Sequence, residues 1–141
     1  MRFKYARELS DLEDCPPAYY ERRDFTAHRF VFADLSHANN FLPALKISPR
    51  RIHSPPFVSD TARCLGYALS LFDTLENAHR RYRQISRFNR NFYKVVGTHI
   101  ARAQIESADG LASPPDGHGH ISLHEAENVD LGAKFRIVEE L

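Results

Sequence analysis

The segment that most constrains the fold is residues 64–88, CLGYALSLFDTLENAHRRYRQISRF, where the hydrophobic pattern changes once. Residues 64–72 are nearly all apolar or small, which is typical of a buried strand. Apolar positions at helical spacing follow, at Leu75, Ala78, Tyr82 and Ile85. Asp73 stands where a helix N-cap belongs, with Glu76 as its capping-box partner. The segment therefore predicts a strand, a tight turn and an amphipathic helix at about 73–88.

The remaining pattern is dominated by strands. Alternating or β-branched runs predict strands at 26–33, 92–106, 120–125 and 134–140. Gly97 interrupts the alternation within 92–106, so we expect a β-bulge there. Residues 34–45 predict one or two helical turns ending near Pro43, and a short helix is expected before Pro16. The segments 46–60 and 107–119 are rich in proline, glycine or serine and predict loops.

This order of elements favours an α+β fold with a mostly antiparallel sheet. The 141 residues, of which 43% are hydrophobic, are sufficient for one core and for a single domain, 1–141. We expect residues 1–25 to form a peripheral N-terminal segment. No signal-peptide pattern and no apolar run of about 18 residues is present, so the sequence predicts a cytoplasmic protein without a membrane partner.

The net charge of +1 gives no overall attraction to nucleic acid or membranes, so electrostatic recognition must be local. Cys15 and Cys64 are the only cysteines and form no C-x-x-C pair. Two cysteines can form one disulfide, but in a cytoplasmic protein we expect reduced thiols, with Cys64 buried.

Three histidines lie within DGHGHISLHE, residues 116–125. On a strand, His120 and His124 would be about 13 Å apart at roughly 3.3 Å per residue, too far to share one metal ion. His118 and His120 form an H-x-H pair, but no spacing identifies a third ligand, so we predict no metal. HISL also resembles one copy of the H-Φ-[ST]-Φ motif of 2H phosphoesterases, which need two copies. The roles of the three histidines stay open.

Arg29 on an early strand, Ser70 on a central strand and the Glu125-Ala126-Glu127 triplet at the end of a late strand follow one another along the chain. This order resembles the R-S-E layout of ADP-ribosyltransferase-like proteins, over roughly residues 28–138. The usual S-T-S is replaced by ALSLF at 68–72. The helix directly after Ser70 is similar to RES-type toxins that degrade NAD, although their GRWN motif is absent.

The resemblance implies that NAD is a substrate and that cleavage of its nicotinamide–ribose bond passes through an oxocarbenium-like transition state. Glu127 would face that positive charge and Glu125 would be a general base. Ser70 would fix the ribose, and Arg29, with His28 beside it on the strand, would hold the phosphates. The implied protein is a bacterial NAD-consuming toxin or effector, either a transferase or a glycohydrolase, with an antitoxin, immunity protein or target protein as partner.

A second hypothesis rests on basic residues of the predicted helix and its end. Four arginines recur at spacings of three, four and three: Arg80, Arg83, Arg87 and Arg90. Such a row can bind nucleic-acid phosphates or an acidic protein. The alternative to an enzyme is thus a non-enzymatic binding module that uses this row. A third hypothesis is that the chain is itself an immunity or antitoxin protein.

Overall fold

The computed structural model describes residues 1–141 as one six-stranded antiparallel sheet with five α-helices, which confirms the predicted α+β fold. The strands are β1 (Phe25–Val31), β2 (Leu69–Phe72), β3 (His99–Ile105), β4 (Gly110–Ala112), β5 (His120–Glu125) and β6 (Arg136–Glu140), in the spatial order β4-β5-β2-β1-β3-β6. The helices are α1 (Ala6–Ser10), α2 (Ala44–Ile47), α3 (Asp60–Gly66), α4 (Leu75–Phe88) and α5 (Phe92–Val96).

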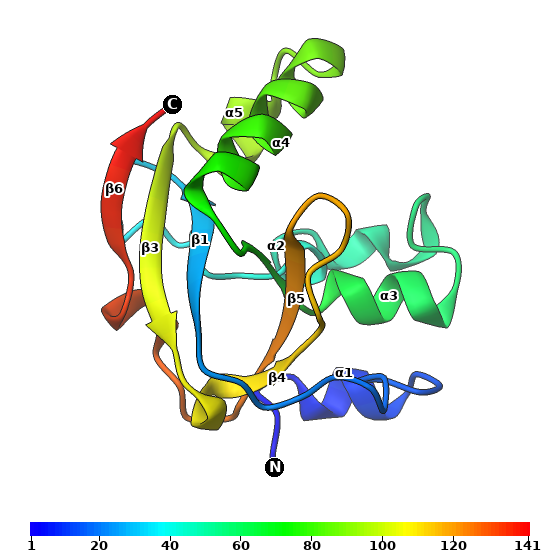
Figure 1. The fold of residues 1–141 in the computed structure, drawn as a ribbon. Helices are drawn as coiled ribbons and strands as arrows, with labels where there is room; N and C mark the ends of the chain where they lie inside the picture. Colours follow the sequence, from blue (N-terminus) through cyan, green and yellow to red (C-terminus); the bar gives the residue numbers. More distant parts are fainter.

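The helices gather into two groups (Figure 1). α4 and α5 lie together at one end of the molecule, near the ends of β1 and β3, whereas α2 and α3 lie beside β5. α4 packs on the sheet face that carries Phe72 and Ile100. The main core lies on the opposite face and contains Ala27, Val31, Leu69, Leu71, Ile121 and Leu123. Its members alternate along each strand, as a half-buried antiparallel strand requires.

The segment before β2 differs from its prediction. Residues 64–66 belong to α3, and the strand begins only at Leu69. Ser59 caps α3 by accepting a hydrogen bond from the backbone N–H of Ala62 at 3.1 Å. An apolar run does not distinguish a buried helix from a buried strand, and here Ser59 provides the helix start.

α4 is confirmed with a shifted start. Thr74, rather than Asp73, is the N-cap, and its hydroxyl accepts from the backbone N–H of Asn77 at 3.0 Å. Asp73 instead accepts from the side-chain amide of Asn77 at 2.8 Å.

The predicted strand 92–106 is a helix followed by a strand. Gly97 is not a bulge: it ends α5 with φ of 92°, and a Cβ there would lie 2.1 Å from the carbonyl oxygen of Val31. The predicted helix at 34–45 is also wrong, because Pro43 precedes α2 as its N-cap. Parts of the predicted loops are ordered, as α2, a 3₁₀ helix at Pro49–His53 and β4.

The N-terminal segment contacts the sheet at Phe3, which bridges to Ala126, and at Glu21, which bridges to Ala112. Cys15 and Cys64 form a disulfide, so the expectation of reduced thiols is wrong in this structure, while Cys64 is buried as predicted. Their Cα atoms lie 5.7 Å apart, a proximity that sequence spacing could not reveal. No helix combines the length and the apolar character needed to cross a membrane.

Candidate functional site

The candidate site lies where β1 and β2 separate. These strands pair at one position only, His28 with Phe72, whereas β1 pairs with β3 at seven positions. Beyond His28 the backbones diverge, and Arg29 spans the gap. Its Nη1 donates to the backbone carbonyl of Ser70 at 2.9 Å, a contact between residues 41 positions apart in the chain.

Arg29 is held almost entirely by backbone oxygens. Its Nε donates to the carbonyl of Asn40 at 2.7 Å, and Nη2 reaches that of Leu42 at 3.5 Å. Burial lowers the pKa of Arg29 to about 10, partly offset by the charge of Glu125, and the group stays cationic at neutral pH. Arg29 forms no ion pair, so its charge is uncompensated by any contacting carboxylate.

A cavity of about 200 Å³ opens at this gap, bounded by β1, β2, α2 and α5. Arg29 and Ser70 both line it. Polar groups at its wall come from Asn39, Ser48 and Arg51, and apolar ones from residues such as Phe30, Leu42 and Val96. No carboxylate lines the cavity.

Ser70 is exposed, and its hydroxyl lies 2.9 Å from Nε2 of His120. The β2–β5 register pairs Ser70 with Ser122 and Phe72 with His120. The side chains of Ser70 and His120 therefore lie on the same face of the sheet. Burial lowers the pKa of His120, opposed by Asp116 and assisted by Arg81, so the ring is neutral at pH 7. A neutral imidazole nitrogen can accept the hydroxyl proton, which is the geometry of a general base.

Asp116 fixes the turn that leads into β5. One of its carboxylate oxygens accepts from the backbone N–H groups of His118 and His120, at 2.8 and 2.9 Å. These two bonds determine where β5 begins and therefore how His120 is presented to Ser70.

His28 has a structural environment rather than a place in the cavity. Arg102 donates to its Nε2 at 3.0 Å, so Nδ1 carries the proton and faces the Phe72 carbonyl at 3.3 Å. Burial lowers the pKa of His28. It is 4% exposed, and it does not line the cavity.

The two predicted glutamates lie apart from this cavity. Glu125 is 3% exposed, pairs with Lys4 at 3.3 Å and leaves Oε2 without a hydrogen-bond partner. Burial raises the pKa of Glu125, and Lys4 lowers it. Glu127 is exposed beyond the end of β5, in a shallow depression with Arg2 and Arg22. The structure therefore brings Arg29 and Ser70 together but brings neither glutamate into their cavity.

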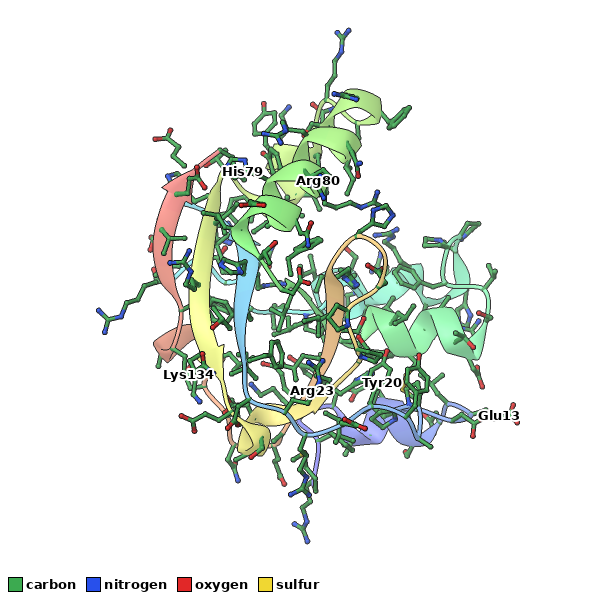
Figure 2. The ribbon with its side chains drawn as sticks, in the orientation of Figure 1. Glu13, Tyr20, Arg23, His79, Arg80 and Lys134 are labelled. Atoms are coloured by element: carbon green, nitrogen blue, oxygen red, sulfur yellow. A yellow bond between two sulfur atoms is a disulfide. The ribbon has the colours of Figure 1, made fainter.

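The arginine row is exposed at all four positions. None of its members forms a salt bridge, and only Arg80 has a recorded side-chain bond, to Asn77 at 2.9 Å. Phe88, at the C-terminal end of α4, is 92% exposed. Figure 2 shows Arg80 on α4, well separated from Tyr20.

His120 is the residue whose role the sequence left open and whose contact the structure supplies. The strand alternation predicted the face on which it lies, but the sequence did not predict which strand pairs with β5.

No protein-family model, curated protein or solved structure matches this chain.

Proposed function

We propose that the cavity between β1 and β2 binds part of an NAD molecule, and that His120 and Ser70 promote cleavage of its nicotinamide–ribose bond. The observation that carries the proposal is the position of Ser70, which lines the cavity together with Arg29 and whose hydroxyl lies 2.9 Å from Nε2 of His120. An unpaired cation beside a nucleophile–base pair fits an anionic substrate that reacts with water or a hydroxyl.

The cavity is smaller than the roughly 300–1,000 Å³ of most ligand pockets. One half of a dinucleotide would therefore be enclosed. The diphosphate would lie at the mouth, where Arg51 is exposed. Arg29, whose bonds go to carbonyls, is a positioning residue: it holds β2 against β1 and contributes positive charge near the phosphates.

In hydrolysis, the bond between ribose C1′ and the nicotinamide nitrogen breaks, and its electron pair neutralises the positively charged ring. Water oxygen bonds to C1′ and gives its proton to the Ser70 hydroxyl, while the Ser70 proton passes to Nε2 of His120. In transfer, an acceptor hydroxyl takes the place of water. The positive charge of the pyridinium ring passes to the ribose in this step, and the proposal gives Glu127 no part in it because Glu127 does not line the cavity.

The decisive experiment measures nicotinamide release from NAD by the wild type, Ser70→Ala and His120→Gln. Loss of the general base in His120→Gln, or of the hydroxyl beside it in Ser70→Ala, should lower the rate by about 10²–10⁴-fold. Glu127→Gln and His118→Gln are matched controls outside the Ser70–His120 pair and should retain the wild-type rate. Absence of release by the folded wild type, with cell extract supplying acceptors, would overturn the proposal, as would full activity of His120→Gln.

A toxin or effector role extends this proposal, because unrestrained NAD loss harms the cell that contains the enzyme. Expression of the wild type should deplete cellular NAD and slow growth, and His120→Gln should do neither. An antitoxin or immunity partner would then be a protein whose co-expression restores NAD. NAD depletion by His120→Gln, equal to that by the wild type, would contradict this role.

The second candidate function is binding of nucleic acid by the arginine row. Four exposed, unpaired guanidinium groups and the exposed Phe88 ring favour it, since phosphates and bases are recognised by such groups. Salt-dependent retention on single-stranded nucleic acid should fall in Arg83→Ala/Arg87→Ala. Arg22→Ala/Arg136→Ala removes the same charge from exposed positions elsewhere and should bind as the wild type does. Equal retention of both double variants would leave only non-specific charge attraction.

A further inference from the structure

A second cluster of reactive side chains lies where the N-terminal segment meets the end of β5, and the proposed function does not use it. Cys15, Cys64 and His124 present one ligand atom each, and the three atoms lie within 4.8 Å of one another. Cys64 Sγ and His124 Nε2 are 3.4 Å apart. The three residues come from the loop after α1, from α3 and from β5.

The environment of His124 is the observation that points to a ligand. The side chain is 1% exposed and lies against the rings of Phe3 and Tyr20. Its only recorded polar contact is with Cys64 Sγ. Sulfur is a weak hydrogen-bond acceptor, so the disulfide satisfies this buried nitrogen poorly. An imidazole nitrogen 3.4 Å from one sulfur atom and within 4.8 Å of a second supplies, in contrast, three ligands that suit a zinc ion.

The distances agree with a tetrahedral ion. Zinc bonds of about 2.3 Å to sulfur and about 2.0–2.1 Å to nitrogen imply sulfur–nitrogen separations of about 3.6 Å and sulfur–sulfur separations of about 3.8 Å. The first is already met within a few tenths of an ångström. The second requires the disulfide to open and the Cys15 side chain, on its loop, to turn aside.

An access route is present. Cys64 and Tyr20 line an open cavity of about 840 Å³, and Figure 2 shows Tyr20 in the space between α1 and α3. Glu13, Asp14 and Asp60 also line it, and their carboxylates favour the approach of a cation. A water molecule from this cavity can reach the ion and serve as its fourth ligand.

We infer that Cys15, Cys64 and His124 form a redox-gated zinc site, which exchanges a disulfide for a bound ion. A dithiol reductant transfers two electrons and two protons to the disulfide, giving two thiols and an oxidised reductant. Zinc then binds both sulfurs as thiolates and His124 through Nε2, and two protons are released to solvent. In each state the N-terminal segment stays linked to α3.

The test uses the full chain, reduced with dithiothreitol and freed of it without air. Cobalt(II) is the spectroscopic probe and zinc the competitor. The reduced wild type should bind one cobalt ion with a thiolate-to-metal charge-transfer band, which zinc displaces. Zinc should also raise the melting temperature, by an amount that grows with the logarithm of its concentration over Kd. The oxidised chain is the first control, because its sulfurs are occupied, and it should give no band.

Variants separate ligands from neighbours. Cys15→Ser should reduce the charge-transfer band, and Cys15→Ser/Cys64→Ser should abolish it. His124→Gln should weaken binding, whereas His118→Gln should not. A reduced, folded chain without the band would overturn the inference, as would a band in the double variant or equal effects of the two histidine changes. Loss of circular dichroism on reduction that zinc does not restore would overturn it too.

Discussion

Ser70 Oγ and His120 Nε2 lie 2.9 Å apart although 50 residues separate them in the chain. The β2–β5 register produces this contact, because Phe72 stands opposite His120 and Ser70 is two residues away on the same face. The pair is adjacent to the place where β1 leaves β2, so the irregularity of the sheet exposes the hydroxyl. Its chemical role can be tested through the protonation of His120.

Nicotinamide release should depend on pH through His120. Burial holds the pKa of His120 below its usual value of 6.5, so the ring is neutral and able to accept a proton at pH 7. We expect a plateau above pH 6.5 and a loss of rate as pH falls through the lowered pKa. Arg81→Gln removes a cation that lowers this pKa, so the midpoint should move upward. An unchanged midpoint in Arg81→Gln would contradict the assignment of the profile to His120.

Arg29→Met should destabilise the fold as well as the site. The guanidinium donates to the carbonyls of Asn40 and Ser70, which the substitution leaves without this donor. We expect a loss of about 2–4 kcal/mol in the free energy of unfolding, measured by urea titration. Arg22→Met, at an exposed position, should change it by less than about 0.5 kcal/mol. Equal stabilities of the two variants would show that Arg29 does not join the strands.

Local patterns predicted the helix at about 73–88, observed at 75–88, and the strand at 120–125, because both segments carry a strong hydrophobic period over their length. The same patterns misassigned 64–66 and 92–96, where apolar runs of similar composition are helical. Cap geometry decides those cases: Ser59 begins α3 and Gly97 ends α5. Neither signal outweighs an apolar run when the sequence is read alone.

The contacts within the candidate site were harder to predict from the sequence than the secondary structure. The order of Arg29 and Ser70 along the chain predicted one shared site, and the contact between the two residues joins the Arg29 guanidinium to the backbone carbonyl of Ser70. The positions of the two carboxylates could not be inferred, since Glu125 ends β5 and pairs with Lys4, whereas Glu127 lies exposed beyond the strand. Long-range contacts such as Ser70 with His120, or Cys15 with Cys64, depend on strand register and loop path, which the local sequence does not encode.

The disulfide should contribute strongly to stability in the absence of metal. Cys15 and Cys64 are 49 residues apart, and closing a loop of that size lowers the entropy of the unfolded chain by an amount worth about 4 kcal/mol. Cys15→Ala/Cys64→Ala, compared with the oxidised wild type in a chelator, should therefore unfold at lower urea concentration. The reduced wild type should behave like the double variant under those conditions. A difference below about 1 kcal/mol would mean that the unfolded chain is already compact in this region.

Glu125→Gln should stabilise the protein at neutral pH. Burial raises the pKa of Glu125 above its ordinary value of 4.5 despite Lys4, so the folded state binds the proton more tightly than the unfolded state. The stability due to this group is therefore complete below pH 4.5 and is lost as pH rises through the raised pKa. Glu125→Gln cannot ionise and avoids that loss.

Urea titrations between pH 4 and pH 8 test this prediction. The free energy of unfolding of Glu125→Gln should exceed that of the wild type at pH 7, and the excess should shrink as pH falls through the raised pKa and vanish below pH 4.5. Glu127→Gln is the matched control, because its side chain is exposed and should leave the pH dependence unchanged. If Glu125→Gln is instead less stable at pH 7, the pair with Lys4 outweighs the cost of burying a carboxylate whose Oε2 has no partner.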